Sequence, residues 1–403
     1  MTFGMDSTLY LKLSALMFLE YAIWGAWYPV LAARLLGPLK FSGKQTGWIY
    51  AALPLACIFM PLVAGQLADK RFNTEYILAA AHLAGIALLF LAAWMRKFKL
   101  LFLVIFLYSL CYAATLPLVN SLMFHHLAKN KIDANATSPY IFMWAPIAWA
   151  LAGYFLTCWR WVFKSGERGR DCLILAAALS VAMVVVAGGF LPATPPSGAT
   201  GEGSSLAKAF EMLKDSSFLI FMIISIVAAG MMQFYFLGTA RFMQDNGIAS
   251  KNVPAAMAIA QAAQAAATLF LLGLLVSRLH YKWTLTVGAA SWFVLYFLYV
   301  APRPAWVIVI AQAFHGLAYV FFIIAGQMFV GKVAPPDIVA STQAMIFMAQ
   351  SGVGLFLGTQ FAGIVMDLCR AGDRFRWRRL WMVPGLIMAG CVAALVLLFR
   401  STI

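Results

Sequence analysis

The sequence has too few charged residues for a water-soluble protein. Only 11% of its 403 residues are Asp, Glu, Lys or Arg, and 64% are hydrophobic, whereas about a quarter of the residues of soluble domains are charged. A chain this apolar cannot present a water-compatible surface. The composition therefore predicts a polytopic membrane protein.

Acidic residues are especially scarce, and cysteines are few. There are 14 Asp and Glu against 29 Lys and Arg, which gives a net charge of +15. The basic residues are scattered through short segments between hydrophobic runs, which argues against a nucleic-acid-binding surface and places them at lipid headgroups. The six cysteines form no C-x-x-C pair, so we expect no disulfide framework, no metal site and no cofactor.

Long hydrophobic runs dominate the chain. A membrane-spanning helix needs about 20 mostly apolar residues, and twelve runs reach that length, near 11–36, 46–67, 76–95, 99–124, 139–163, 172–192, 217–243, 253–277, 281–301, 305–331, 339–366 and 379–399. The segments between them are short except for one. We predict an all-α membrane protein with two six-helix bundles, 1–192 and 217–403.

The exceptional segment is 193–216, which joins the two predicted bundles. It is rich in Pro, Gly and Ser and then amphipathic from Leu206 to Leu213, which predicts a linker with a short amphipathic helix. On either side of it, Gly65–Phe72 (GQLADKRF) is echoed by Gly273–His280 (GLLVSRLH). Repeated halves of this kind are typical of transporters whose substrate site lies at the midplane between them.

One carboxylate stands inside the first hydrophobic run. Glu20 lies in FLEYAIWGAWYPVL, and its spacing to Trp24 and Trp27 puts an acid and two indoles on one helix face. A charge at mid-bilayer costs about 2.5–3.5 kcal/mol on insertion scales, so such residues are functional candidates by default. The alternative is a protonated Glu20 that bonds a neighbouring helix as a packing residue.

Other polar side chains fall at mid-depth, where each needs a partner in protein, water or ligand. Several share helix faces with one another or with aromatic rings. A cavity with amides, a phenol and aromatic walls suits a neutral, planar, hydroxylated ligand; the alternative is that the amides bond between helices. The predicted substrate-binding residues are Trp24, Asn120, Phe142, Trp149, Gln233, Gln261, Gln264, His315 and Tyr319.

His315 is also a candidate for proton exchange, since imidazole gains and loses a proton near neutral pH. A partner for Glu20 across the cavity would be an ionisable side chain in the other half, and His315 fits that description. We therefore predict Glu20 and His315 as proton-coupling residues. The alternative for His315 is a satisfied packing residue.

The segment Gly65-Gln66-Leu67-Ala68-Asp69-Lys70-Arg71 resembles the cytoplasmic signature loop of the major facilitator superfamily. The resemblance implies a conformational role for Gly65, Asp69, Lys70 and Arg71, and it places both termini in the cytoplasm. The positive-inside rule favours the reverse orientation, because many Lys and Arg residues then lie in outward-facing loops. We give the specific motif more weight than the statistical charge bias.

Longer stretches resemble the nucleoside:proton symporter family over essentially the whole chain. They include FLEYAIWGAW, CIFMPLVAGQLADK, YSLCYAATLPLVNSL and HGLAYVFFIIAGQMFVGKVAPPDIVASTQAM. By this resemblance Gln233 and Gln261 match family glutamines, and the family's helix 7 Asn falls on Phe236, which joins the predicted substrate site. The family's helix 5 Arg and helix 8 acid, a charge-coupling pair, fall on Phe142 and Gln264, so both charges are absent.

Glu20 stands where family members commonly have an uncharged amide, and the family's helix 10 Tyr and Phe fall on His315 and Tyr319. Losing both members of a charge pair strands no buried charge. We therefore predict that the ionisable group has moved from helices 5 and 8 to helix 1, as Glu20, with His315 as its partner.

The sequence thus predicts a secondary transporter and not an enzyme, since the only clustered histidines near a membrane surface are His125 and His126. We expect a monomer that imports nucleosides or similar small hydroxylated solutes across a bacterial inner membrane, with protons, by alternating access. The alternatives are a sugar or sugar-derivative carrier, an exporter of the same fold, or a non-transporting membrane sensor.

Overall fold

The computed structural model describes residues 6–166, 168–196, 209–301, 304–335, 338–372 and 374–400. Within these residues, 12 helices are long and apolar enough to cross a membrane. The predicted all-α architecture of twelve spans is therefore confirmed. The protein is an integral membrane protein.

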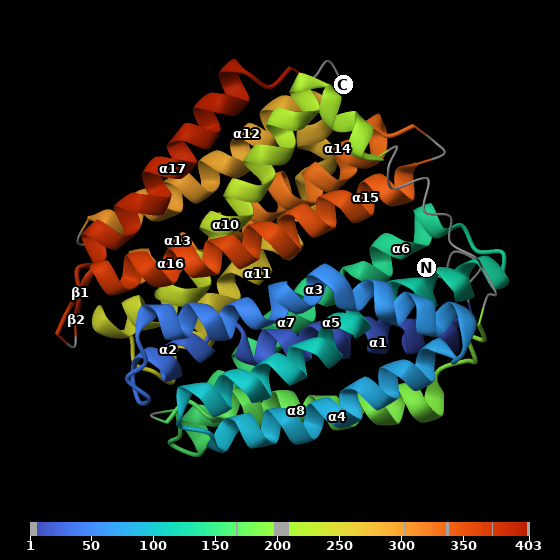
Figure 1. Ribbon diagram of the computed structural model, residues 1–403, viewed down its shortest axis with the longest axis horizontal. Coiled ribbons are helices and arrows are strands. Elements are labelled where there is room, and N and C mark those ends of the chain that lie inside the picture. Colours follow the sequence, from blue (N-terminus) through green and yellow to red (C-terminus); the bar gives the residue numbers. More distant parts are fainter. Residues whose placement is uncertain are drawn as a thin grey trace.

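The first six spans form what we call the N half (Figure 1). Three of these spans are interrupted, two by breaks between helices and one by a π-helical turn. The elements are α1 (Ser7–Trp27), α2 (Leu31–Leu36), α3 (Gly43–Lys70), α4 (Thr74–Trp94), α5 (Phe98–Lys129), α6 (Ala134–Phe142), α7 (Trp144–Val162), α8 (Asp171–Val185) and the π-helix η1 (Val186–Phe190).

The last six spans form the C half, in which two spans contain π-helical segments. Its elements are α10 (Ser216–Asp245), α11 (Val253–Phe270), α12 (Leu272–Val300), α13 (Ala305–Ala318), η3 (Tyr319–Ile324), α14 (Ala325–Val333), α15 (Val339–Phe347), η4 (Met348–Gly354), α16 (Leu355–Leu368), the antiparallel strands β1 (Arg370–Ala371) and β2 (Arg374–Phe375), and α17 (Trp377–Leu397).

The linker is described only in part. Residues 197–208, which include the start of the predicted amphipathic helix, lie outside the described residues; 209–211 are helical and lead into the 3-10 turn η2 (Met212–Lys214). The predicted signature loop is shorter than expected, because α3 continues through Lys70 and the chain turns only at 71–73.

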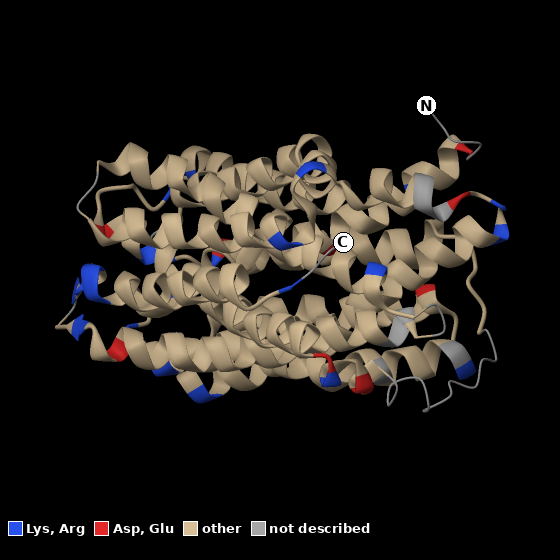
Figure 2. Ribbon diagram, turned by 90° about the horizontal axis from the view of Figure 1, so that it is seen from above, with Lys and Arg blue, Asp and Glu red and all other residues tan. Residues whose placement is uncertain are grey.

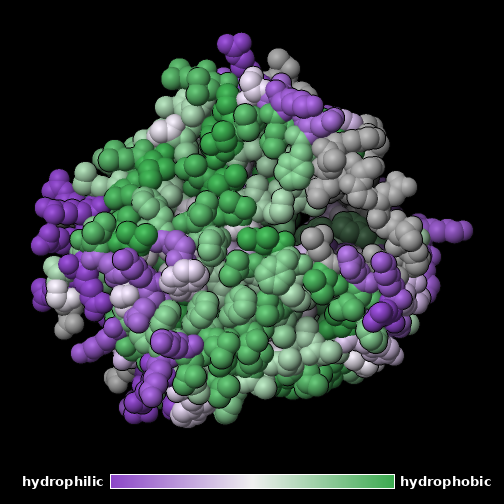
Figure 3. All heavy atoms as spheres, in the orientation of Figure 1, coloured by the Kyte–Doolittle hydropathy of each residue, from purple (hydrophilic) through white to green (hydrophobic). Residues whose placement is uncertain are grey.

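The outer surface matches a lipid environment. Large apolar side chains point outward, such as Phe270 at 75% exposure and Leu397 at 73%. Figure 2 shows most charged residues gathered toward the two ends of the long axis, and Figure 3 shows a hydrophobic face between hydrophilic ends. The long axis therefore runs across the membrane.

The halves meet mainly where α3 packs on η4 and α16, where α7 packs on α11, and where α2 packs on α10. Glycines allow the close approach: a Cβ on Gly47 would lie 2.5 Å from the Thr359 carbonyl, and one on Gly153 would lie 2.9 Å from the Pro254 carbonyl. These contacts lie toward the end that carries β1 and β2 (Figure 1), which we call the closed end. Figure 3 shows a hollow between the halves toward the opposite end.

Polar contacts fasten the closed end across the halves. The Asp367 carboxylate, at the last turn of α16, accepts hydrogen bonds from the backbone N–H groups of Gly43 (2.5 Å) and Lys44 (2.9 Å) at the start of α3. A carboxylate there also faces the positive end of the helix dipole. The contact therefore joins the halves by charge as well as by hydrogen bonding.

A second fastening is built on Arg160 of α7. Its guanidinium forms two hydrogen bonds to Asp171 (2.7 and 2.8 Å) and donates to the Ser250 carbonyl of the C half (3.0 Å). Arg160 is almost fully buried, so this paired, forked geometry is needed to offset its desolvation.

Candidate substrate and proton sites

A chain of aromatic rings crosses the interface between the halves. Trp24 of α1 lies 5.2 Å from Trp149 of α7 between ring centroids, Trp149 lies 6.5 Å from Phe236 of α10, and Phe236 lies 5.5 Å from His315 of α13. We call Trp24, Tyr28, Trp149, Phe236 and His315 the central cluster. It unites four of the predicted substrate residues with Tyr28, and it supplies rings on which a planar ligand can stack.

Tyr28 ties the central cluster to a predicted amide. Its ring lies 4.9 Å from Phe236, and its hydroxyl donates to Gln233 Oε1 at 3.2 Å. The amide N–H group of the buried Gln233 and the indole N–H of Trp24 have no hydrogen-bond partner among the described residues. Unpaired buried donors carry a free-energy cost that a ligand hydroxyl or carbonyl group would remove.

Gln261 is placed at the same interface by helix periodicity. Pro254 and Ala258 of α11 pack against Gly153 of α7. Gln261 lies seven residues after Pro254 and three after Ala258, so it is on the same face of α11. Because α7 runs antiparallel to α11, Gln261 lies level with Trp149, which is one turn before Gly153. Gln264 follows on the next turn, and both glutamines are 8% exposed.

His315 and Tyr319 lie where α13 crosses α11. Gly316 contacts the Ala260 carbonyl directly, and a Cβ there would be 2.7 Å from the Gln264 nitrogen. This contact brings His315 and Tyr319 beside the α11 glutamines. The helix then changes to the π-helical η3 at Tyr319, a distortion that is frequent at functional sites.

Asn120 and Phe142 lie apart from the central cluster. Phe142 packs on Phe124 at 6.2 Å, and Asn120 is one helical turn from Phe124 on α5. No ring contact or hydrogen bond in the described part of the chain joins either residue to the central cluster.

The predicted pairing of Glu20 with His315 is not formed, which corrects that expectation. Glu20 points into the N half, where Oε2 is 3.0 Å from His82 Nε2 and Oε1 is 2.6 Å from Thr115 Oγ1. His315 stacks on Tyr235 in the C half, at 3.7 Å between centroids, and its Nδ1 accepts from the Trp292 indole at 3.2 Å. His315 thus has its own partners, and Glu20 bonds within its half.

Sequence reasoning missed His82 and Thr115. His82 is the one ionisable side chain inside the run ILAAAHLAGIALLF of α4, and that isolation is the signal that would have found it. Thr115 gives no such signal, because threonine hydroxyls commonly bond their own helix. Tyr28 was also missed, since one phenol among many aromatic residues does not stand out.

The signature residues are placed at the end opposite the closed end. Gly65 and Lys70 lie on the last turns of α3, and Arg71 caps the helix. Lys70 and Arg71 are exposed. The side chain of Asp69 lies outside the described residues, so the bracing role predicted for this segment stays a prediction.

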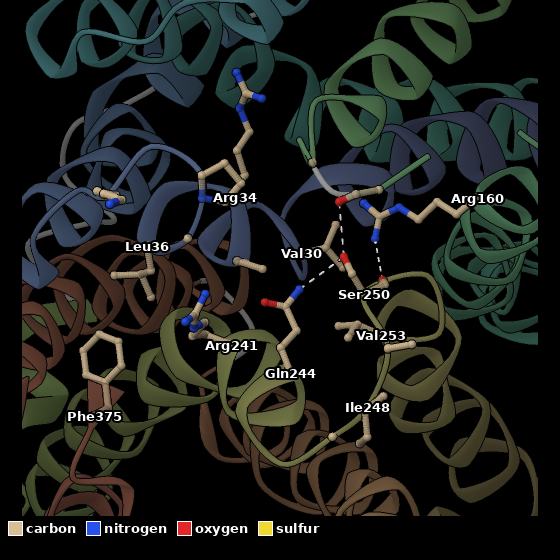
Figure 4. A pocket seen from close by; sticks show the side chains of 18 of the residues that line it. Val30, Arg34, Leu36, Arg160, Arg241, Gln244, Ile248, Ser250, Val253 and Phe375 are labelled. Carbon is tan, nitrogen blue, oxygen red and sulfur yellow. Dashed lines mark hydrogen bonds between the residues drawn. The ribbon is translucent and has the colours of Figure 1, made fainter. Parts of the chain in front are cut away.

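A cavity of about 630 Å³ lies at the closed end, shown in Figure 4. Val30, two residues after Tyr28, lines it together with basic side chains from both halves, including Arg34, Arg160 and Arg241. Within the described residues, no group of three or more His, Cys, Asp or Glu could hold a metal ion.

Two six-helix halves around a central interfacial site define a secondary transporter with the major facilitator superfamily fold. Comparison with known proteins narrows this class. The Nucleoside H+ symporter family matches residues 7–403. The chain therefore belongs to the nucleoside:proton symporter family and is a transporter, not an enzyme.

Individual relatives agree with this assignment. The chain is 30% identical over 406 residues to nucleoside permease NupG of Escherichia coli (strain K12), covering 97% of this chain and 95% of NupG. It is 28% identical to the putative nucleoside transporter YegT of the same strain, covering 96% and 93%. A crystal structure of a NupG point mutant matches with a TM-score of 0.88 at 27% identity, covering 97% of this chain and all of that one.

Proposed function

We propose that this protein imports nucleosides together with protons across a bacterial inner membrane. The central cluster carries the proposal: it joins indole and phenyl rings from both halves, and its Tyr28 bonds the buried Gln233, whose N–H donor is unpaired among the described residues. A nucleobase stacks on such rings, and its sugar hydroxyls bond amides. The family and its relatives named for nucleosides point to the same substrate class.

The proposed orientation identifies the conformational state of the structure. With both termini in the cytoplasm, the closed end faces outward and the structure is the inward-facing state of an alternating-access cycle. The bond between Tyr28 and Gln233, the Asp367 contact and the Arg160 contact then seal the outer side.

The proton in this proposal is carried by Glu20. The positions of the family's Arg and acid hold Phe142 and Gln264 here, whereas Glu20 is a fully buried carboxyl group beside the substrate site. Ionisable groups within a membrane domain are proton-relay candidates by default. His315, with its own partners in the C half, remains proposed as a substrate residue.

Transport by purified protein in proteoliposomes tests this function. Vesicles loaded with unlabelled uridine should take up radiolabelled uridine by exchange, and adenosine but not a hexose should compete. Gln233→Leu should weaken binding by about tenfold, because both amide bonding groups are lost. The control is Gln343→Leu, whose amide donates to Gln327 within the C half. Competition by hexoses and not by nucleosides would identify a sugar carrier instead.

A further inference from the structure

Three polar side chains meet in the interior of the N half. Glu20 comes from α1, His82 from α4 and Thr115 from α5, and their exposures are 0%, 2% and 0%. We call these the acid cluster. A carboxyl group buried this completely among membrane helices is stable only if its oxygens are hydrogen-bonded in the protonation states that it adopts.

The ionised state of Glu20 is fully bonded. Thr115 Oγ1 lies 2.6 Å from Oε1 and can donate to it, and His82 Nε2 lies 3.0 Å from Oε2 and donates as N–H. Each carboxylate oxygen therefore has a donor. Hydrogen bonds to an ionised oxygen are about twice as strong as neutral ones.

In the protonated state each oxygen of Glu20 also has a hydrogen-bond partner, because the Thr115 hydroxyl has a second acceptor. Oγ1 also lies 2.7 Å from the Tyr112 carbonyl oxygen. When Glu20 carries a proton on Oε1, that O–H donates to Thr115 Oγ1, and the threonine hydrogen turns to the carbonyl. His82 continues to donate to Oε2. Only a hydroxyl hydrogen has to move.

We propose that the acid cluster is the proton-binding site of this transporter, with Thr115 as the group that serves both protonation states. This proposal rests on the proposed function and deepens it. One added proton converts a cluster of charge −1 to a neutral one, whether the carboxyl or the imidazole holds it. A neutral cluster has a lower desolvation cost than a charged one, so proton loading makes it easier for the cluster to stay buried while the halves move.

Among the described residues, no hydrogen bond or ion pair joins a further charged side chain to the acid cluster. Besides His82, the ionisable side chains that interact with Glu20 are phenols, Tyr21 on α1 and Tyr108 and Tyr112 on α5. The packed helices α7 and α8 contribute Arg160 and Asp171, which pair with each other at the closed end.

The acid cluster is joined to the substrate site through one turn of α1. Tyr112 donates its hydroxyl hydrogen to the Glu20 carbonyl at 2.7 Å, and its ring lies 6.1 Å from Trp24 of the central cluster. Glu20 and Trp24 are four residues apart on the same face. A ligand that displaces Trp24 therefore disturbs the bonds that hold Glu20, which provides a physical route for coupling.

Two transport modes of the full chain in proteoliposomes test the proposal. Exchange of labelled for unlabelled uridine needs no net proton movement, whereas accumulation uses the gradient. A gradient of one pH unit supports up to about tenfold accumulation for one proton per nucleoside. We expect Glu20→Gln to retain exchange and to lose accumulation completely. Retained exchange with accumulation equal to that of the wild type would overturn the proposal.

Thr115 variants test whether the Thr115 hydroxyl bonds Glu20 in both protonation states. Thr115→Val removes the bond to the ionised carboxylate, the stronger of the two, so the pH midpoint of accumulation should rise by about one unit. Thr115→Ser keeps the hydroxyl and should keep the wild-type midpoint. If Thr115→Val exchanges uridine normally and its pH midpoint of accumulation is unchanged, the proposed role of Thr115 is contradicted. If Thr115→Val does not fold, an altered midpoint in Thr115→Ser would contradict that role instead.

Infrared spectroscopy separates failure of this inference from failure of the proposed function. Purified protein taken through a pH step should show a carboxylic acid band that is absent in Glu20→Gln, whether or not nucleosides are the substrate. If uridine exchange fails in the wild type but the band titrates, the substrate class is wrong and the proton site stands. If exchange succeeds and no band titrates, the acid cluster is a fixed structural element.

Discussion

The hydroxyl of Tyr28 donates to Oε1 of Gln233 at 3.2 Å, joining the N half to the C half at the central cluster. Tyr28 lies at the break between α1 and α2, where its own carbonyl accepts from the Tyr50 hydroxyl at 2.6 Å. Tyr28 therefore links the two halves and holds the amide of Gln233 in place.

Tyr28→Phe should weaken nucleoside binding by about two- to tenfold. The phenylalanine ring keeps the contact with Phe236, but Gln233 Oε1 loses its hydrogen bond from the Tyr28 hydroxyl, so the amide is no longer held in position. A neutral hydrogen bond contributes about 0.5–1.5 kcal/mol. Titration of purified protein with uridine measures the change. The control is Tyr10→Phe, whose hydroxyl bonds only within the N half. Equal losses in both variants would contradict a specific role for Tyr28.

Asp367→Asn should loosen the closed end. The amide cannot accept from both backbone N–H groups at the start of α3, and the charge that faces the helix dipole is lost. With the native cysteines replaced by alanine and Val253→Cys as a reporter inside the closed-end cavity, thiol labelling should be about tenfold faster in Asp367→Asn.

The control for this experiment is Asp245→Asn. Asp245 pairs with Arg241 at 2.9 Å and accepts from the Trp377 indole, both within the C half. It should therefore leave the labelling rate of Val253→Cys near that of the parent. A rate in Asp367→Asn no faster than in this control would show that the carboxylate does not fasten the closed end.

Gly316→Val should destabilise the C half and abolish transport. The added side chain would collide with the Ala260 carbonyl and the Gln264 nitrogen, which are backbone atoms that can move only if α13 and α11 separate; overpacking typically costs about 1–3 kcal/mol. Thermal melting of purified protein measures the loss. Gly390→Val is the matched control, because a Cβ at Gly390 meets no atom within 4 Å. Melting temperatures that fall equally would contradict the account.

The fold followed readily from the sequence, because a membrane span is a local property. A run of about 20 apolar residues can be recognised as a span from its own sequence, whatever it packs against. All twelve spans were found this way. Close helix packing also has a local signal, because Gly354 and Gly358 form a G-x-x-x-G pair, and a Cβ on Gly354 would lie 2.8 Å from the Ile226 carbonyl of α10.

The site was harder to predict, because it depends on which side chains meet across helices. Glu20 stood out because placing a carboxyl group in the membrane costs free energy. Its partner was predicted in the wrong half, because helix periodicity shows which face of a helix a side chain is on but not which helix packs against that face. His82 and Thr115 became visible only when α1, α4 and α5 were packed together. Likewise, nothing in the sequence near Asp367 indicates that it bonds the start of α3.

The most direct test of the account is proton movement that depends on both the nucleoside and Glu20. Proteoliposomes without a gradient, containing the full chain and a pH-sensitive dye, should acidify inside when uridine is added outside, because each nucleoside brings a proton with it. Glu20→Gln, checked for uridine exchange in a parallel assay with uridine-loaded vesicles, should give no dye response. Acidification by Glu20→Gln equal to that of the wild type would contradict the central claim.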